Sequence, residues 1–437
     1  MNPHPPVLGT QHCRLVLDLG TTTLAGRLLG ADGALLAEAR AANPQRSLGA
    51  DILIRLQHAY EGGGAELQQL LVTGVRSLVA DLLERGGVPA AAAVAAAAAG
   101  NPGICHLLCQ LPVKGLIFPP HRSPLTHLTL LPPDAPDLGL AVPLQLFPAL
   151  SGFAGGDLLA DLYGLLETPA QGQAESSRLT MPSPRSLASG PCLLIDLGTN
   201  AELALWNGAH WRVSSAAAGP AFEAANIACG MPLAPGAVTD VQLSDDHLLL
   251  TVAGGGRPLG LCGSGLLALI AAARQGGLID AGGRIVPPAE ITTNLARYLV
   301  ADGAGWALCF HRDARGELRL AQEDVRQLQL AKGAVRAGIE VLLDHARMGA
   351  DAVQRVFVTG AFGAALPLAA VKGIALLPEA MVDKLFFMAN GVLDGLENFL
   401  GDPQGAVRLQ ALQATIKPLP LSGSPAFEQR FLAALEF

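Results

Sequence analysis

Two short acidic turns, far apart in the chain, carry residue types that could do chemistry. Asp18 and Asp196 each open the sequence Asp-Leu-Gly-Thr at the end of an apolar run. Glycine lets the backbone bend tightly and approach a ligand, and the hydroxyl and amide donors that follow suit phosphate oxygens. Two carboxylates beside a polyphosphate would repel it unless a cation were present. We therefore predict that Asp18 and Asp196 bind Mg²⁺, directly or through water.

The bland alternative is that each aspartate only stabilises its own turn by accepting hydrogen bonds from nearby amides. The surrounding sequence argues against this, because each turn is followed by a second apolar run and then by Asp-Gly at 32–33 or Asn-Gly at 207–208. Such pairs between apolar runs are strong hairpin signals, since both central residues need positive φ. The chain thus repeats one strand–turn–strand–hairpin–strand unit, and we predict that both copies contact phosphate.

Three further features are candidates for the same site. Segment 260–265 is rich in glycine and precedes a helix, so its free amides could bind an anion, or Ser264 could simply cap that helix. Asp157 and Glu223 are the catalytic candidates, because either carboxylate could position an attacking water or help to hold the metal. Each could instead be an ordinary carboxylate favoured by the dipole of a helix terminus.

The periodicity of apolar residues indicates alternating strands and helices that would position these groups. Helices are expected at 50–60, 65–85, 103–111, 154–166, 266–275, 325–347 and 391–400, and a strand at 353–358. Segment 88–99 could be a strand or a buried helix. Segment 167–191 is rich in Pro, Ser, Gln and Ala and is expected to be a linker. We therefore place a first lobe at 12–166, the linker at 167–191 and a second lobe at 192–437.

Composition narrows the class of protein. The formal charge is −8 with no cluster of Lys and Arg, so nucleic acid is not expected as a partner. The start of the chain does not have the pattern of a signal peptide, and the most apolar stretch is too short to cross a bilayer. The seven cysteines are scattered and odd in number, which is typical of free thiols in a reducing compartment. A cytoplasmic protein without membrane contact is expected.

Five segments together resemble the actin, sugar-kinase and heat-shock-chaperone ATPase superfamily, and they occur in its order. The two acidic turns resemble its phosphate-1 and phosphate-2 motifs, 356–363 its adenosine motif, and 155–157 and 391–400 its connecting helices. The resemblance implies an α/β, ribonuclease-H-like fold of two actin-like lobes, with mixed sheets flanked by helices and a nucleotide cleft between the lobes. The nucleotide contacts that it implies are Gly20, Thr21, Thr22, Gly198, Thr199, Asn200, Gly219, Gly263, Ser264, Gly360, Ala361, Phe362 and Gly363.

A closer resemblance, from about residue 12 onward, is to the C-terminal ATPase portion of the reductive activators of corrinoid proteins. It rests on 100–108, 217–231, 260–270 and the adenosine segment. It implies a homodimeric module that binds or hydrolyses ATP with Mg²⁺ and promotes reactivation of a corrinoid protein or corrinoid methyltransferase from Co(II) to Co(I). A small-molecule kinase of the same fold, or a nucleotide-dependent docking protein without a redox function, are the alternatives.

Full-length activators of this type also carry an iron–sulfur domain, which needs closely spaced cysteines. The chain has one close pair, Cys105 and Cys109, so we expect it to bind no iron–sulfur cluster and to receive electrons from a separate iron–sulfur protein or ferredoxin. Cys229 and Cys262 lie in glycine-containing loops and could bridge a cluster between two subunits. They could equally be small buried thiols, which is how free cysteine usually behaves.

Overall fold

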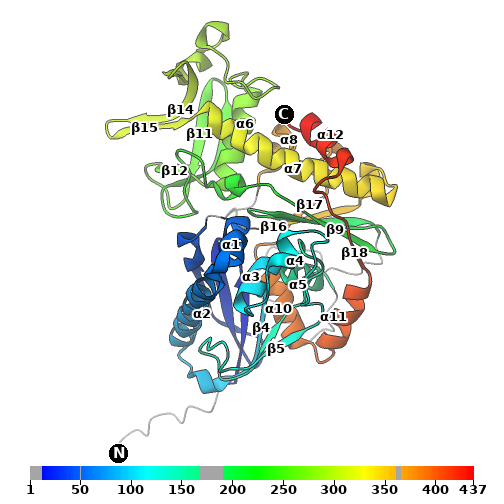
Figure 1. Ribbon diagram of the computed structural model, residues 1–437. Coiled ribbons are helices and arrows are strands. Elements are labelled where there is room, and N and C mark those ends of the chain that lie inside the picture. The colour runs from blue at the N-terminus through cyan, green and yellow to red at the C-terminus, as the bar shows by residue number, and fades with distance from the viewer. Residues whose placement is uncertain (1–11, 50, 167–189, 361–365) are drawn as a thin grey trace, which may run out of the picture. The chain divides into compact units, whose positions relative to one another are not determined.

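The computed structural model describes residues 12–49, 51–166, 190–360 and 366–437 of the chain. The chain divides into two compact units (Figure 1). The first unit contains Met1–Leu187 and Asn390–Pro418, and the second contains Ala188–Ala389 and Leu419–Phe437. Among the described residues, no helix has both the length and the apolar character needed to cross a membrane.

The first unit is built on a mixed sheet of six strands in the order β3-β2-β1-β4-β6-β5. The bounds are β1 Cys13–Leu19, β2 Thr23–Gly30, β3 Leu35–Ala42, β4 Ala93–Gly100, β5 Thr129–Leu131 and β6 Leu144–Leu146. β1, β2 and β3 form an antiparallel meander, whereas β4 runs parallel to β1, and β6 parallel to β4. The carboxyl ends of β1 and β4 therefore lie side by side, which is where ligands bind in sheets of this kind.

Helices cover both faces of this sheet. The helical elements are η1 Pro44–Ser47, α1 Ile52–His58, the π-helical turn η2 Ala59–Gly63, α2 Gly64–Gly86, η3 Ala90–Ala92, α3 Pro102–Leu108, α4 Lys114–Ile117, α5 Gly156–Gly164, α10 Gly391–Gly401 and α11 Gly405–Ala414, followed by strand β18 Ile416–Pro418. Gly26 and Arg27 are adjacent on β2 and so face opposite sides. Gly26 faces Leu82 of α2, whereas Arg27 bonds to α10, so α2 and α10 lie on opposite faces.

Segment 88–99, which the sequence left open, forms η3 and most of strand β4. Ala96, Ala97, Ala98 and Ala99 are fully buried between β1 and β6. A run of alanines has no helical or strand periodicity of its own, so the pairing of β4 with its two neighbours decides its conformation.

The second unit repeats this arrangement. The strands of its main sheet that belong to this unit have the order β17-β16-β7-β8-β9. Their bounds are β7 Cys192–Leu197, β8 Ala201–Trp206, β9 Trp211–Ala216, β16 Arg355–Gly360 and β17 Leu385–Phe387. β7, β8 and β9 are an antiparallel meander, β16 is parallel to β7, and β17 is parallel to β16. These are the directions and the order of β1, β2, β3, β4 and β6, so the predicted internal repeat is confirmed, as are the mixed sheets flanked by helices.

The two predicted hairpins are present, although their turns differ from the expected geometry. Gly33 and Gly208 have positive φ values of 83° and 95°, whereas Asp32 and Asn207 do not. Their side chains instead accept hydrogen bonds from backbone amides inside the turn, at Ala34 in the first copy and at Ala209 and His210 in the second. A side-chain oxygen that satisfies local amides stabilises the turn without a second residue in the left-handed region.

The rest of the second unit consists of two small sheets and the helices around them. The sheets are β11-β10-β12 and β13-β14-β15. The strands are β10 Ala237–Ser244, β11 His247–Val252, β12 Gly260–Leu261, β13 Leu299–Asp302, β14 Gly305–Asp313 and β15 Gly316–Leu320. The helices are η5 Pro220–Glu223, α6 Gly263–Gln275, η6 Pro288–Glu290, η7 Asn294–Tyr298, α7 Gln322–Ala346, η8 Ala350–Ala352, α8 Leu368–Gly373, α9 Glu379–Val382 and α12 Pro425–Ala433.

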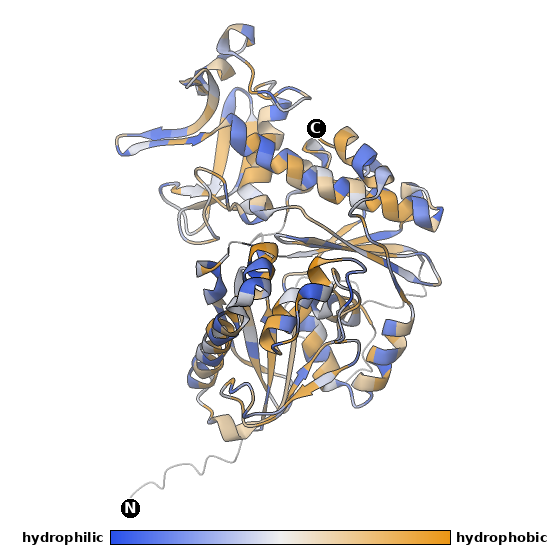
Figure 2. Ribbon diagram, viewed as in Figure 1, coloured by the Kyte–Doolittle hydropathy of each residue, from blue (hydrophilic) through white to orange (hydrophobic). Residues whose placement is uncertain are grey.

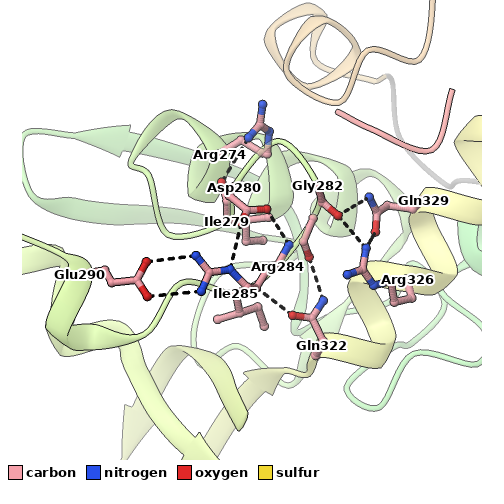
Figure 3. A network of polar contacts seen from close by, with 11 residues as sticks. Arg274, Ile279, Asp280, Gly282, Arg284, Ile285, Glu290, Gln322, Arg326 and Gln329 are labelled. Carbon is pink, nitrogen blue, oxygen red and sulfur yellow. Dashed lines mark hydrogen bonds and ion pairs between the residues drawn. The ribbon is translucent and has the colours of Figure 1, made fainter. Parts of the chain in front are cut away.

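Helix α7 organises the second unit. It packs on β8 and β9, and Figure 2 shows hydrophobic and hydrophilic residues alternating along it, as an amphipathic helix requires. Near its N-terminus, Gln322 accepts a hydrogen bond from the amide of Ile285 at 2.8 Å and donates to the carbonyl of Gly283 at 2.8 Å. Arg326 and Gln329 donate to the carbonyl of Gly282 (Figure 3). The segment after α6 is thereby fixed to α7.

The division of the chain differs from the lobes expected at 12–166 and 192–437, because residues 390–418 belong to the first unit. Helix α10 packs against α5, β1 and β4. Arg27 of β2 makes ion pairs with two residues of α10, Asp394 at 2.7 Å and Glu397 at 2.6 Å. Of the expected linker at 167–191, residues 167–189 lie outside the described residues.

Candidate functional site

In the first unit, the acidic turn brings two carboxylates together. Asp18 is near the carboxyl end of β1, and Asp157 is in the first turn of α5. Burial and the nearby Asp157 charge raise the pKa of Asp18 to about 7, while Arg40 acts in the opposite direction. Burial also raises the pKa of Asp157 to about 6, against the hydrogen bonds that its carboxylate accepts from its own amide and that of Leu158. A bound cation would relieve the repulsion between these two poorly hydrated carboxylates.

The turn that follows Asp18 is held in place by two asparagines. Asn43 donates from Nδ2 to the carbonyl of Gly20 at 2.9 Å, and its amide donates to the carbonyl of Thr22 at 2.9 Å. Asn101 donates from Nδ2 to Oγ1 of Thr21 at 2.8 Å. A Cβ at position 20 would lie 2.5 Å from the carbonyl oxygen of Thr23, so only glycine fits this bend.

The second acidic turn is fixed by a different set of contacts. The amide of Gly198 donates to the carbonyl of Asn200 at 3.2 Å, and the amide of Gly219 to the carbonyl of Thr199 at 2.8 Å. The Thr199 hydroxyl donates to Oε1 of Glu223 at 2.9 Å. Gly219 has a φ of 75° with nothing within 4 Å of an added Cβ, so this backbone borders open space. The site therefore joins Gly198, Thr199, Gly219 and Glu223 within one unit.

Asp196 lies in a polar row that crosses the sheet of the second unit. Thr359, Asp196, Glu202 and Ser215 are directly opposite one another on neighbouring strands, so their side chains share a face. Ser215 donates to Oε1 of Glu202 at 3.2 Å.

The matching row of the first unit has two alanines and two charged residues. It consists of Ala99, Asp18, Ala25 and Arg40. The two aspartates thus occupy equivalent positions in the two copies, but Asp18 has only small neighbours in its row besides Arg40. The repeated unit therefore presents two chemically different environments to its acidic residue.

The predicted adenosine segment is described only in part. Gly360 ends β16 with a φ of 123°, and a Cβ there would lie 2.1 Å from the carbonyl oxygen of Leu197. Glycine is therefore required where β16 turns away from β7. Ala361, Phe362 and Gly363 lie outside the described residues, so their predicted nucleotide contacts stay predictions.

The structure rules out one of the two alternatives for the glycine-rich segment before α6, namely that Ser264 caps the helix. Cys262 is the N-cap residue of α6, and Gly263 and Ser264 are its first residues. Ser264 does not cap the helix, because it is fully buried and its hydroxyl donates to the carbonyl of Thr239 at 2.8 Å. Any anion contact here would have to come from backbone amides such as that of Gly263 rather than from the serine hydroxyl.

The thiols of the second unit and of α3 lie in largely buried surroundings. Cys262 is 2% exposed and donates to the carbonyl of Val238 at 3.2 Å. Burial, with a smaller contribution from Asp324, raises the pKa of Cys229 to about 12, and burial raises the pKa of Cys109 to about 11. Since iron and zinc bind the thiolate, these environments favour the bland interpretation of the cysteines as packed side chains.

Asn43, Asn101 and Arg40 were missed by the sequence reasoning. The two asparagines carried a readable signal, because each is followed by proline, and Asn at the N-cap with Pro at the first helical position is a common helix start. Both do cap helices, η1 and α3. No local sequence pattern could show that the side-chain Nδ2 groups of both asparagines reach the same acidic turn, since Asn101 is 80 positions from Thr21.

The arrangement is suited to a hydrated divalent cation and an anionic ligand. Across the described ranges, no group of three or more His, Cys, Asp or Glu side chains could hold a metal. Mg²⁺ is usually bound through one or two carboxylates, with waters and phosphates completing its coordination. The pair of Asp18 and Asp157, beside a turn rich in hydroxyl and amide groups, fits that requirement.

Two family descriptions cover most of the chain. Residues 190–437 match the C-terminal domain of RACo, described as the ASKHA domain, and residues 13–165 match the RACo middle region. The chain also resembles a solved structure, a reductive activator for a corrinoid, iron–sulfur protein. The TM-score is 0.85 with 24% identity, over 98% of this chain and 66% of that one. This likeness confirms the predicted actin-like fold.

Two curated relatives add sequence similarity. The chain is 26% identical to the corrinoid activation enzyme RamQ of Eubacterium limosum, over 96% of this chain and 69% of the relative. It is 29% identical to the [Co(II) methylated amine-specific corrinoid protein] reductase of Methanosarcina barkeri, over 40% of this chain and 32% of the relative. The chain thus spans about two thirds of one relative and of the solved activator, and about a third of the other relative.

Proposed function

The chain belongs to the RACo family, and from this we propose that it is an ATP-dependent module promoting the reduction of a corrinoid protein from Co(II) to Co(I). The names of its relatives, a corrinoid activation enzyme and a corrinoid protein reductase, support this proposal. The partner that we propose is a corrinoid protein or a corrinoid methyltransferase.

One observation in the molecule carries the ATP part of the proposal. Asp18 and Asp157 have raised pKa values beside a phosphate-type turn, which is the electrostatic condition that a cation would relieve. We assign Asp18 to Mg²⁺, with Asp157 helping to hold it, and we assign Asp196 to the same chemistry in the second copy. Glu223 orients the Thr199 hydroxyl through their 2.9 Å hydrogen bond, as a positioning residue of the second turn.

In this proposal, bound Mg·ATP supplies the free energy that makes an unfavourable electron transfer proceed. The contribution of the chain is to bind and orient the nucleotide. The turn at 20–22 and the turn at 198–200 present amide and hydroxyl donors, and Gly219 borders open space where a ligand could approach the backbone. Binding that differs between two conformations would bias the partner toward its reducible state.

We place the electron donor on a separate iron–sulfur protein or ferredoxin. The described thiols support this, because burial raises the pKa of Cys229 and of Cys192 to about 12, which disfavours the thiolate that a cluster needs. We also propose a homodimer in the cytoplasm, on the resemblance to the activators. Gel filtration with light scattering would test the dimer.

The test is anaerobic reduction of a corrinoid protein poised in the Co(II) state. The full chain, a reduced ferredoxin and Mg·ATP are mixed with it, and Co(I) is followed by absorbance. We expect ATP-dependent formation of Co(I), and a loss of roughly 100-fold or more in rate with Asp18→Asn, since a metal-bound phosphate contributes several kcal/mol. The matched control is Asp81→Asn, an exposed carboxylate on α2 paired with Arg85.

Two outcomes would contradict the proposal. If Co(I) forms equally fast without nucleotide, ATP has no part in the reaction. If ATP is consumed with a sugar and without any corrinoid protein, the kinase alternative is favoured instead.

A further inference from the structure

We propose that Asn101 is a positioning residue for nucleotide phosphate, because its side-chain amide fixes the Thr21 hydroxyl as a donor toward a phosphate oxygen. This inference rests on the proposed function, since it presumes that the first acidic turn binds a nucleoside polyphosphate. It adds a specific task for one residue outside the acidic turns.

The orientation of the Asn101 amide is set by the helix that it caps. Asn101 is the N-cap residue of α3, and its Oδ1 accepts a hydrogen bond from the amide of Ile104 at 3.0 Å. Only the oxygen can accept from that amide. The nitrogen must then face the other way, where it donates to Oγ1 of Thr21 at 2.8 Å. Asn101 is 8% exposed, so water does not compete readily for either contact.

This contact directs the Thr21 hydroxyl proton away from Asn101, so that the hydroxyl is available as a donor. A hydroxyl has a single proton and two lone pairs, and Asn101 occupies a lone pair. Within the described part of the chain, the Thr21 hydroxyl donates to no acceptor. A phosphate oxygen has only lone pairs to offer, so a hydroxyl held as a donor is its complement.

The backbone on both sides of Thr21 is also held, so the hydroxyl cannot easily turn elsewhere. Asn43, which is fully buried, bonds to the carbonyl of Gly20 and to that of Thr22. On the other side of Asn101, a Cβ added to Gly155 would lie 2.7 Å from the Cα of Asn101. The start of α5 therefore packs directly against Asn101. Asn101 therefore couples the turn at 20–22 to α3 and to the start of the helix that carries Asp157.

The test separates the donor of Asn101 from its capping function. Asn101→Ser keeps an oxygen that can cap α3, because Ser and Asn are equally good N-cap residues, but it removes the amide donor without adding charge. Thr21→Val removes the hydroxyl at nearly constant shape. Dissociation constants for Mg·ATP are measured by calorimetry on the full-length variants and on the double variant, and melting temperatures are measured without nucleotide.

We expect each single variant to bind Mg·ATP about ten- to a hundredfold more weakly, the range for one hydrogen bond to a charged group. The double variant should bind no more weakly than Thr21→Val alone, since Asn101 acts through Thr21. Thr21→Ser should keep the wild-type affinity. The matched control is Asp51→Ser, which changes the residue that caps α1 through the amide of Ile54 and should leave the affinity unchanged.

Wild-type affinity in Asn101→Ser would overturn the inference. So would a double variant whose loss is the product of the two single losses, because the two residues would then act independently. Loss of affinity in Thr21→Ser would show that the methyl group matters instead of the hydroxyl. If the unmodified chain fails to bind Mg·ATP at all, the proposed function fails first and removes the premise of the inference.

Discussion

Asp18 and Asp157 hold protons at pH values where ordinary aspartates have lost them. Their pKa values, about 7 and about 6, are raised by burial and, for Asp18, by the neighbouring charge. An ionised pair in this place has an energetic cost in the metal-free protein. Such electrostatic repulsion between carboxylates is typical of a site that binds a cation.

The pair should make the metal-free protein less stable as pH rises. Both folded pKa values lie above the unfolded aspartate value of 3.8, so between about pH 4 and pH 7 the native state binds more protons, and stability falls as pH increases. Asp18→Asn should flatten this fall and be more stable than wild type at pH 8. Urea unfolding at pH 5 and pH 8, with a chelator present, measures the difference. Parallel curves for wild type and variant would contradict the assignment.

At the scale of elements, the contact between α5 and α10 depends on glycine. Gly395 of α10 lies against α5 so closely that an added Cβ would be 1.8 Å from the carbonyl oxygen of Ala160. Gly164 faces it, with its Cβ position 3.3 Å from the Gly395 amide nitrogen. Two helices can approach to this distance only where one side lacks a side chain.

Gly395→Ala should therefore destabilise the protein by about 1–3 kcal/mol, the usual cost of overpacking. Gly64→Ala is the control, because Gly64 has helical φ and ψ values and the nearest atom to its added Cβ is 3.9 Å away. That substitution should stabilise by about 0.5–1 kcal/mol through the unfolded state. Thermal or urea unfolding distinguishes the two signs. If both variants are equally stable, the close approach is not a real constraint.

At the scale of the whole molecule, the first unit is assembled from two separate stretches of chain. Asn390–Pro418 contributes α10 and α11 to it. Without them, the Arg27 side chain, which is 7% exposed, would keep Glu38 but lose Asp394 and Glu397. A buried cation that loses most of its counter-charges is strongly destabilising.

A fragment of residues 12–187 should consequently fail to fold cooperatively. The same fragment joined by a flexible linker to residues 390–418 should unfold in one sharp transition, followed by circular dichroism in urea. A version joined to a Gly-Ser segment of equal length controls for chain length. Equal cooperativity in all three proteins would show that α10 and α11 are dispensable for the first unit.

The sequence by itself determined the repeated strand–turn unit, its hairpins, the type of most helices and the family resemblance. Apolar runs, Asp-Gly pairs and helix caps act over a few residues, so their signals are readable in order along the chain. Contacts between distant segments were decided only by the tertiary structure: β4 as a strand, the pairing of Asp18 with Asp157, the reach of Asn101 to Thr21, and the return of 390–418 to the first unit. These depend on which surfaces pack together, and no local pattern encodes a packing partner many residues away.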